Sequence, residues 1–451
     1  MTEQPARHVE PYIIPRSEHR ISRSQISDNA LKVLYRLKNA GYGGYLVGGG
    51  VRDLSLGREP KDFDVATDAT PEQVNELFRN CRLIGRRFRL AHVHFGREII
   101  EVATFRALHN GDNGDNSDNG DSGGNDVNDD GVVSDDGMIL RDNVYGTIEE
   151  DALRRDFTVN ALYYNIADFS IVDYAGGMAD LEEGVIRLIG DPETRFREDP
   201  VRMLRAVRFA VKLGFRLDPA IAASIPELAP LLADVPAARL FEEVLKLFFG
   251  GQAEGTFELL RRMRLFGYLF PATDRLLDEA GDDVAMAFIA RALANTDLRI
   301  MEDRPVTPAF LFAALLWPVV TSRAAVREAD ADSYPQALQQ AAAEVVEEQV
   351  AIVTIPKRFG VPMREIWSLQ PRFERRSGKR ASRLMGHPRF RAAYDFLLLR
   401  AEAGEVDREL AQWWTDFQQG ETAAASGAGA PNTRRRRQRG GRRRKGGDNG
   451  D

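Results

Sequence analysis

Apolar residues alternate with polar ones, or form short runs, in the first two fifths of the chain, and they recur at helical spacing in most of the rest. Short strands are predicted in six places: residues 44–47, 63–66, 91–95, 99–105, 171–174 and 185–189. Helices are predicted at residues 27–37 and 70–80, and nearly everything between Arg197 and residue 419 has the helical period. The pattern therefore predicts an α+β protein, with its strands in the N-terminal part and helices after them.

Three segments lack both patterns. Residues 1–25 have no clear period, and we expect them to be a disordered N-terminus. Residues 108–137 are mostly Asp, Asn, Gly and Ser, which bury too little apolar surface to offset the entropy of ordering them. Residues 420–451 pass from an Ala/Gly-rich linker into a basic tail. We predict a disordered insertion in the second of these segments and a disordered tail in the third.

The net charge of -7 conceals two opposite charge runs. Nine aspartates and no basic residue lie between Gly111 and Gly137, whereas nine Arg or Lys and no acid lie between Arg434 and Lys445. A basic tail on an otherwise acidic chain indicates a nucleic acid or another anionic surface as partner.

The remaining composition indicates a soluble cytoplasmic protein. The single cysteine, Cys81, excludes internal disulfides and multi-cysteine metal sites. The longest apolar run, residues 309–320, is shorter than the roughly 20 residues that span a bilayer. The N-terminus lacks the basic-then-apolar pattern of a secretory signal. We therefore expect no transmembrane segment.

Residues 46–67 read LVGGGVRDLSLGREPKDFDVAT and contain two acidic residues around Phe63. In a strand, Asp62 and Asp64 would point to the same face, while Phe63 would enter the core. Two adjacent carboxylates repel each other unless a cation binds them. Mg²⁺ prefers one or two carboxylates together with phosphate oxygens. An Asp-x-Asp pair alone is more often a turn or a solvated edge.

The glycine triplet that precedes the acidic pair can bind phosphate. Gly48 and Gly49 leave backbone N–H groups open to a close approach, and Arg52 is suited to a phosphate contact. Asp53 would brace the turn. A glycine triplet alone usually forms a loop, but its short spacing from Asp-x-Asp makes a single compact unit.

The two motifs together resemble the signature of the class II nucleotidyltransferases, which include bacterial poly(A) polymerases and CCA-adding tRNA nucleotidyltransferases. The resemblance covers about residues 30–260. It implies a small mixed-sheet catalytic head whose glycine turn holds a nucleoside triphosphate. It also implies that Asp62 and Asp64 hold two Mg²⁺ ions.

A second motif, EEDALRRDFTVNALYYN, covers residues 149–165. Arg154 and Arg155 are suited to phosphate or base contacts, and Asp156 could ligate a metal, pair with an arginine or cap a helix beginning near residue 157. The resemblance places Asp156 with the catalytic carboxylates. Glu101, on the strand predicted at residues 99–105, competes for this position, and the sequence does not decide between the two.

A third motif, REDPVRMLRAVRFA, begins a predicted helix with Asp199 as N-cap and Pro200 at the first position. Arg202, Arg205 and Arg208 form a basic stripe on this helix, which most often means a solvated face.

The resemblance gives this motif a more specific role. It implies that Glu198, Asp199 and Arg202 read the hydrogen-bonding edge of the incoming base, and that Arg155 also contacts the nucleotide. In a poly(A) polymerase the base would be that of ATP.

Two further stretches resemble the poly(A) polymerase branch. One is residues 83–96, and the other is residues 378–402. Residues 372–391 contain eight Arg or Lys against one acid, Glu374, which predicts a path for RNA. No D-x-R-x-P-like motif of the CCA-adding relatives is visible.

The predicted activity is therefore template-independent transfer of AMP from ATP to RNA 3′ ends, including mRNA and decay intermediates. A CCA-adding enzyme and a non-catalytic RNA-binding protein on the same fold are the alternatives. A metal-dependent phosphohydrolase is disfavoured, because the six histidines form no His-Asp dipeptide. Nothing in the sequence indicates a protein partner.

We divide the chain as follows: a disordered N-terminus (1–25), the catalytic head (26–190), a helical neck that binds nucleotide and RNA (191–260), a helical body with a C-terminal RNA-binding domain (261–419), and the basic tail (420–451).

Overall fold

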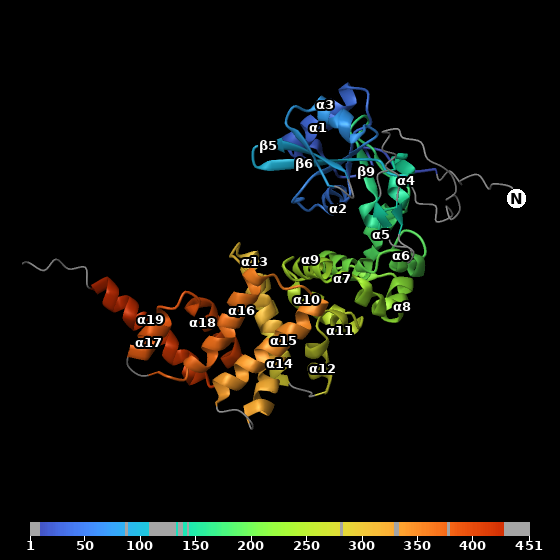
Figure 1. The fold of residues 1–451 in the computed structure, drawn as a ribbon. Helices are drawn as coiled ribbons and strands as arrows, with labels where there is room; N and C mark the ends of the chain where they lie inside the picture. The colour runs from blue at the N-terminus through green and yellow to red at the C-terminus, as the bar shows by residue number, and fades with distance from the viewer. Residues whose placement is uncertain are drawn as a thin grey trace, which may run out of the picture.

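The computed structural model describes residues 10–85, 89–107, 132–133, 139–141, 144–279, 283–328, 333–376 and 379–427. Most of the predicted insertion and the whole run of basic residues in the tail lie outside the described residues. The α+β class is confirmed, because an eight-stranded mixed sheet is followed by a region that consists almost entirely of helices. Figure 1 shows the sheet as a separate head, joined through α5 to α8 to an elongated helical part.

The head is built on the strand order β1-β10-β9-β2-β3-β6-β5-β4. The strands are β1 (Tyr12–Ile14), β2 (Tyr45–Val47), β3 (Asp64–Thr67), β4 (Cys81–Ile84), β5 (Leu90–Phe95), β6 (Glu98–Thr104), β9 (Leu162–Asn165) and β10 (Ile171–Asp173). Only β3 and β6 pair in parallel within this sheet; its other described pairs are antiparallel.

The two faces of the sheet are covered unequally. Leu46, Val65 and Val102 belong to the main hydrophobic core, where α1 (Asp28–Asn39) and α3 (Pro71–Leu77) pack against the strands.

The opposite face carries a smaller apolar cluster formed by Val47, Ala66 and Tyr163 together with Ala152 of α4 (Ile148–Leu153). Asp64 and Glu101 are both solvent-exposed. Because Val47 pairs with Asp64, which in turn pairs with Glu101, this is also the face that carries the two acidic side chains.

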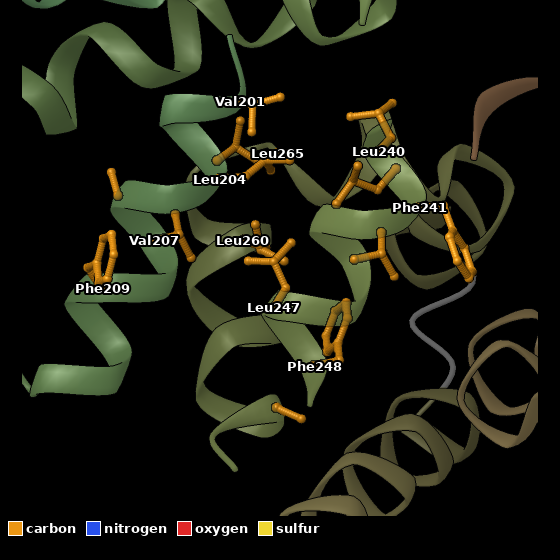
Figure 2. Close-up of a cluster of buried hydrophobic side chains, with 14 of the residues drawn as sticks. Val201, Leu204, Val207, Phe209, Leu240, Phe241, Leu247, Phe248, Leu260 and Leu265 are labelled. Atoms are coloured by element: carbon orange, nitrogen blue, oxygen red, sulfur yellow. The ribbon is translucent and has the colours of Figure 1, made fainter. Parts of the chain in front are cut away.

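The neck begins where α6 (Pro192–Glu198) meets α7 (Val201–Leu213). α7 buries Val201, Leu204 and Val207 at helical spacing and ends at Gly214, whose φ of 74° suits a glycine C-cap. Figure 2 shows these side chains packed against those of α9 (Ala237–Phe248) and α10 (Ala253–Arg262). A short parallel pair, β11 (Val185–Ile186) with β12 (Arg216–Leu217), and α8 (Pro219–Leu228) complete the junction.

The described residues after the neck are mostly helical, as predicted. The body contains α11 (Phe266–Leu269), α12 (Pro271–Glu279), α13 (Asp283–Met301), α14 (Pro308–Glu328), α15 (Tyr334–Ile352) and α16 (Lys357–Leu369). The C-terminal helices are α17 (Lys379–Met385), α18 (Phe390–Glu402) and α19 (Arg408–Gly427), and they enclose a second hydrophobic core around Phe373, Phe390 and Trp414.

α14 is long and apolar enough to cross a membrane by length and composition alone. Most of its apolar residues are buried among neighbouring helices, and α15 and α16 make the most extensive of these contacts. Its hydrophobicity is therefore that of a core helix, and the helix is longer than the apolar run at residues 309–320.

The structure corrects two predicted boundaries. Residues 10–25 are not disordered: β1 pairs with β10, and Ile14 and Ile21 are buried in the main core, which holds this segment on the head. α19 continues past residue 419 to Gly427, because the Ala-rich stretch that resembled a linker has high helix propensity.

Candidate active site

The glycine turn lies directly beside the acidic pair. β2 ends at Val47, the backbone partner of Asp64, and Gly48 then takes φ 66° and ψ -130°, a conformation that only glycine adopts without strain. α2 (Gly49–Ser55) begins at the next residue, so its first N–H groups have no partner within the helix. A Cβ placed on Gly50 would lie 3.7 Å from the carbonyl oxygen of Asp62, which shows how closely the two segments approach.

The strand that carries Asp64 begins one residue later than predicted. β3 begins at Asp64, and Asp62 lies in the loop before it, so the two residues are not alternate members of one strand. Phe63 packs against the main core, as predicted.

Glu101 lies directly opposite Asp64 across the parallel β3–β6 pair. Asp64 is open to solvent, but the protein atoms around it desolvate its carboxylate in part. This desolvation, followed by the negative charges of Glu101 and Asp62, raises the pKa of Asp64 to about 6, although Arg155 acts in the opposite direction. Within the described residues, no Lys or Arg pairs with Asp62 or Asp64. Among the described residues, these closely spaced carboxylates therefore have no ion-pair partner, and Arg155 offsets the charge of Asp64 only in part.

This donor set fits Mg²⁺ that arrives with a nucleotide. The described part of the chain has no group of three or more His, Cys, Asp or Glu side chains already arranged around one point. Mg²⁺ is typically bound by one or two carboxylates, substrate phosphates and water, so Asp62 and Asp64 are sufficient protein ligands.

His92 and His94 lie on β5, in agreement with the prediction that they are strand residues. His92 is the backbone partner of Glu101, and its Nε2 lies 3.4 Å from Glu101 Oε1. Arg86 and Arg87 of the resembling stretch at residues 83–96 lie outside the described residues.

Arg52 is almost completely buried below the glycine turn. It donates to Asp53 Oδ1 from Nε at 2.8 Å and to Asn160 Oδ1 from Nη1 at 2.6 Å. Asp53 therefore braces Arg52 rather than the turn itself, and Asn160 connects α2 to the RRDFTVNA segment.

Arg155 lies on the other side of the turn. It donates to Tyr163 Oη at 2.8 Å and to Asp151 Oδ2 at 3.1 Å, and a Cβ on Gly48 would lie 3.4 Å from its Nη1. Burial acts to raise the pKa of Asp151, but Arg155 and the Tyr163 hydroxyl outweigh it and hold that pKa below its usual value. The positive charge beside the glycine turn is thus fixed in place.

Asp156 occupies a different position from the Asp62–Asp64 pair. It accepts from Arg202 Nε at 2.9 Å and also pairs with Arg205, both on α7. Burial would raise its pKa, but these two arginines hold it below the usual value. The helix expected after it is only a short 3₁₀ turn, Thr158–Asn160. Asp156 thus links the head to the neck, while Glu101 is the carboxylate beside Asp64.

The acidic residues of the third motif are both ion-paired, Glu198 with two arginines and Asp199 with a different one. Glu198 Oε2 accepts from Arg195 Nη1 and Arg202 Nη1, both at 2.7 Å, and Asp199 Oδ2 accepts from Arg239 Nη2 of α9 at 2.7 Å. The Arg202 stripe is therefore not a solvated face.

The predicted N-cap of α7 is wrong by one residue: Pro200 is the N-cap, and Asp199 is the C-cap of α6, although its side chain still accepts from the first residue of α7. Val201 N donates to Asp199 Oδ1 at 3.3 Å, and Pro200 precedes the first helical residue.

Sequence reasoning missed several members of these networks: Asp151, Asn160, Tyr163, Arg195 and Arg239. The spacing of Asp151 and Arg155, which are four residues apart, was the one local signal available, but no helix was predicted there to give that spacing a meaning. The others come from distant elements. Arg195, for example, donates to the carbonyl oxygens of Arg154 and Arg155 at 2.7 and 2.9 Å.

Three family models match the chain. Residues 44–187 match the Poly A polymerase head domain. Residues 214–277 match the model described as a probable RNA and SrmB-binding site of polymerase A, and residues 330–446 match the polymerase A arginine-rich C-terminus.

Curated relatives extend the similarity over nearly the whole chain. Poly(A) polymerase I of Salmonella typhimurium is 56% identical over 410 residues, which is 90% of this chain and 85% of that protein. Poly(A) polymerase I of Escherichia coli is 54% identical over 420 residues, covering 92% and 88%. The CC-adding tRNA nucleotidyltransferase of Halalkalibacterium halodurans is 36% identical over 239 residues, 53% of each chain.

Solved structures share the fold at lower identity. A tRNA-processing enzyme matches with a TM-score of 0.57 and 22% identity over 88% of this chain and 92% of its own. A tRNA nucleotidyltransferase complexed with a primer tRNA and an incoming ATP analog matches with a TM-score of 0.54 and 20% identity, covering 87% and 99%. At these identities the likeness supports the fold alone.

Proposed function

The chain belongs to the bacterial poly(A) polymerase I family, which is related to the CCA-adding enzymes, and on that premise we propose that it transfers AMP from ATP to RNA 3′ ends by the site described above. One observation carries the assignment of the site: the glycine turn at Gly48 and the carboxylates of Asp62 and Asp64 lie side by side, and no Lys or Arg of the described residues forms an ion pair with either acid.

The glycine turn and two arginines would bind the triphosphate. The free N–H groups after Gly48 and Gly49 supply donors that need no side chain. Arg155 lies beside Gly48, and Arg52 lies below the turn, so each adds positive charge without having to be ordered on binding. Donors fixed in this way stabilise charge that develops on the phosphates during transfer.

Asp62 and Asp64 would hold the two Mg²⁺ ions, with Glu101 as the third carboxylate of the site. Bound Mg²⁺ lowers the pKa of an attacking hydroxyl and stabilises charge on the leaving pyrophosphate. Asp64 and Glu101 lie opposite each other on β3 and β6, so the attacking RNA 3′-hydroxyl would meet two rigid strand residues rather than a loop.

Asp156 would then act as a positioning residue rather than as a metal ligand. Its pairs with Arg202 and Arg205 fix α7 against the head. Glu198, Asp199 and Arg202 meet at that same junction, and we propose that they select the adenine base. Carboxylates can accept from the exocyclic amine, and arginine can donate to ring acceptors.

A CCA-adding activity is the second candidate, because the head and neck are shared. The matched region of the CC-adding relative covers 53% of this chain, whereas the poly(A) polymerase relatives cover about 90% and include the helical C-terminal part. A non-catalytic RNA-binding role conflicts with the unneutralised carboxylates at Asp62 and Asp64, which would cost stability without a function.

The test is nucleotide incorporation by the purified full-length chain with Mg²⁺ and one nucleoside triphosphate at a time. The primers are a generic RNA oligomer and a tRNA that lacks its CCA end. We expect long tails on the oligomer from ATP only. Incorporation of CTP on the tRNA, with no tailing of the oligomer, would establish the CCA-adding alternative, and no incorporation at all would contradict both. We propose a cytoplasmic location, where RNA 3′ ends and ATP are both present.

A further inference from the structure

A sizeable pocket lies in the body, on a part of the molecule separate from the glycine turn. It has a volume of about 600 Å³ and is enclosed by the first half of α15 and the second half of α16, together with residues 370–372. Figure 1 shows these helices in the elongated helical part, whereas the sheet lies in the head. A volume of this size is in the range of sites that hold a nucleotide.

The pocket has an apolar interior. Leu338, Ala342 and Trp367 are buried residues that form part of its lining, and Pro335 and Val361 are exposed lining residues. Val361 is 47% exposed, so its side chain offers apolar surface at the pocket. Apolar and ring surfaces of this kind are what an unstacked base contacts in single-stranded RNA complexes.

Three arginines line the same pocket: Arg364, Arg372 and Arg375. Arg364 and Arg372 are eight residues apart, so they fall on one side of α16 and its continuation, a little over two turns from each other. All three are exposed, and none has an acidic partner within the part of the chain that the structure describes.

Three arginines that follow in the sequence, in contrast, are ion-paired with acidic residues. Arg389 pairs with Glu365 at 3.0 Å, Arg391 pairs with Asp395 at 3.0 Å, and Arg400 pairs with Glu405 at 2.9 Å. Glu365 is the acidic residue of the pocket lining, and it is already paired with Arg389. The pocket therefore presents three uncompensated positive charges around an apolar interior.

We propose that this pocket binds the RNA strand upstream of the 3′ end, with a base in the apolar interior and phosphates on Arg364, Arg372 and Arg375. The proposal rests on the proposed function, which supplies a single strand long enough to reach from the head to the body. The combination of free arginines and apolar surface is complementary to a polyanion that carries bases. An acidic peptide would use the arginines but has no group that requires the apolar interior.

Two variants test the proposal: one removes the three positive charges of the pocket, and the other places a negative charge beside its apolar interior. R364Q/R372Q/R375Q tests the phosphate contacts, and V361E places a carboxylate at an exposed lining position. The matched controls are K32Q/R36Q/K38Q, which removes three positive charges from α1 on the face of the sheet opposite Asp64, and V350E, which changes an exposed valine of α15 outside the pocket. Thermal unfolding of all four variants shows whether each is folded.

The readout is the affinity of the full-length protein for a labelled RNA of roughly 30 nucleotides, measured without ATP over a range of salt concentrations. We expect R364Q/R372Q/R375Q to bind the RNA about tenfold or more weakly. The plot of log K against log salt should also become less steep by about 2, because each phosphate contact to a single strand contributes about 0.7 to the slope. V361E is expected to weaken binding, and both controls are expected to stay within about twofold of the wild type.

Extension of a very short primer by ATP separates this proposal from the proposed function. A primer of about six nucleotides occupies the head and neck only, so the pocket variants should extend it at the wild-type rate. Unchanged affinity and salt slope for the long RNA in both pocket variants would overturn the proposal, as would an equal loss in K32Q/R36Q/K38Q. Lack of ATP incorporation by the wild type would instead contradict the proposed function.

Discussion

Asp64 is held in a position that is unfavourable for a carboxylate. Its pKa is raised to about 6 from the 3.8 of an unperturbed Asp, so the folded protein binds a proton more tightly than the unfolded chain does. The charge on Asp64 therefore lowers the stability of the metal-free protein above pH 6, and this cost disappears as the pH falls towards 4. A site that binds cations is expected to carry such a cost.

We accordingly expect Asp64→Asn to raise the melting temperature of the metal-free protein at pH 8. The increase should become smaller at pH 5, because the wild-type carboxyl is then largely protonated. Thermal unfolding of both proteins in chelator at the two pH values measures this difference. An equal or lower melting temperature for the variant at pH 8 would contradict the raised pKa.

The roles of Glu101 and Asp156 can be distinguished by measuring how a substitution at each residue changes the free energy of unfolding and the rate of AMP incorporation. Asp156 is ion-paired with Arg202 and Arg205, so Asp156→Asn should cost about 3–5 kcal/mol of unfolding free energy through loss of a buried pair. Glu101 is half-exposed on β6, and Glu101→Gln should leave stability nearly unchanged while it removes most AMP incorporation.

Chemical denaturation and AMP incorporation measured on both variants provide the comparison. Wild-type activity in Glu101→Gln would exclude it from the metal site. A fully stable but inactive Asp156→Asn would return Asp156 to the catalytic group.

The acidic pair and the glycine turn were predictable from the sequence because both lie within 20 residues and their chemistry is explicit in Gly48, Asp62 and Asp64. The choice between Glu101 and Asp156 was not. It depends on the register of β3 with β6 and on ion pairs to α7, and neither leaves a local signal in the sequence.

The glycine turn before α2 depends on one residue with an unusual backbone conformation. Gly48→Ala should cost about 1–3 kcal/mol, because an L-residue is strained at φ 66° and ψ -130°, although its Cβ would only touch Arg155. ATP-dependent extension should fall with it. Gly50→Ala is the matched control, since its Cβ would meet nothing closer than 3.7 Å and its backbone is helical. Equal effects of the two substitutions on unfolding and extension would contradict this account of the turn.

Helices and strands were predicted correctly where apolar residues recur at a regular spacing. They were missed where a segment forms a strand only by pairing with a strand distant in the sequence. The helices of the neck and body follow their apolar spacing. β1 and β9 were missed because their residues alone show no clear strand pattern. Tyr12–Ile14 forms a strand by pairing with β10. Leu162–Asn165 forms a strand by pairing with both β10 and β2. The end of α19 was misplaced because Ala and Gly were read together as a linker.

The molecule as a whole brings the segments beside the glycine turn and around Asp156 into contact with the charged neck helix α7. Arg58 of the head donates to the carbonyl oxygens of Lys212 and Leu213 at 3.2 Å each, and Asp156 pairs with α7. The head and neck thus meet through polar contacts around the site and through the main hydrophobic core, which runs on from the head through the neck into the body. This arrangement places nucleotide chemistry at one end and leaves the helical part free to hold RNA.

The most direct test of the account is a paired measurement on Asp62→Ala and Asp64→Ala: the rate of AMP incorporation into an RNA primer and the affinity for that RNA. We predict that each substitution reduces incorporation below detection, while RNA affinity stays near that of the wild type because the basic surfaces are unchanged. Incorporation at the wild-type rate by both variants would contradict the assignment of the site.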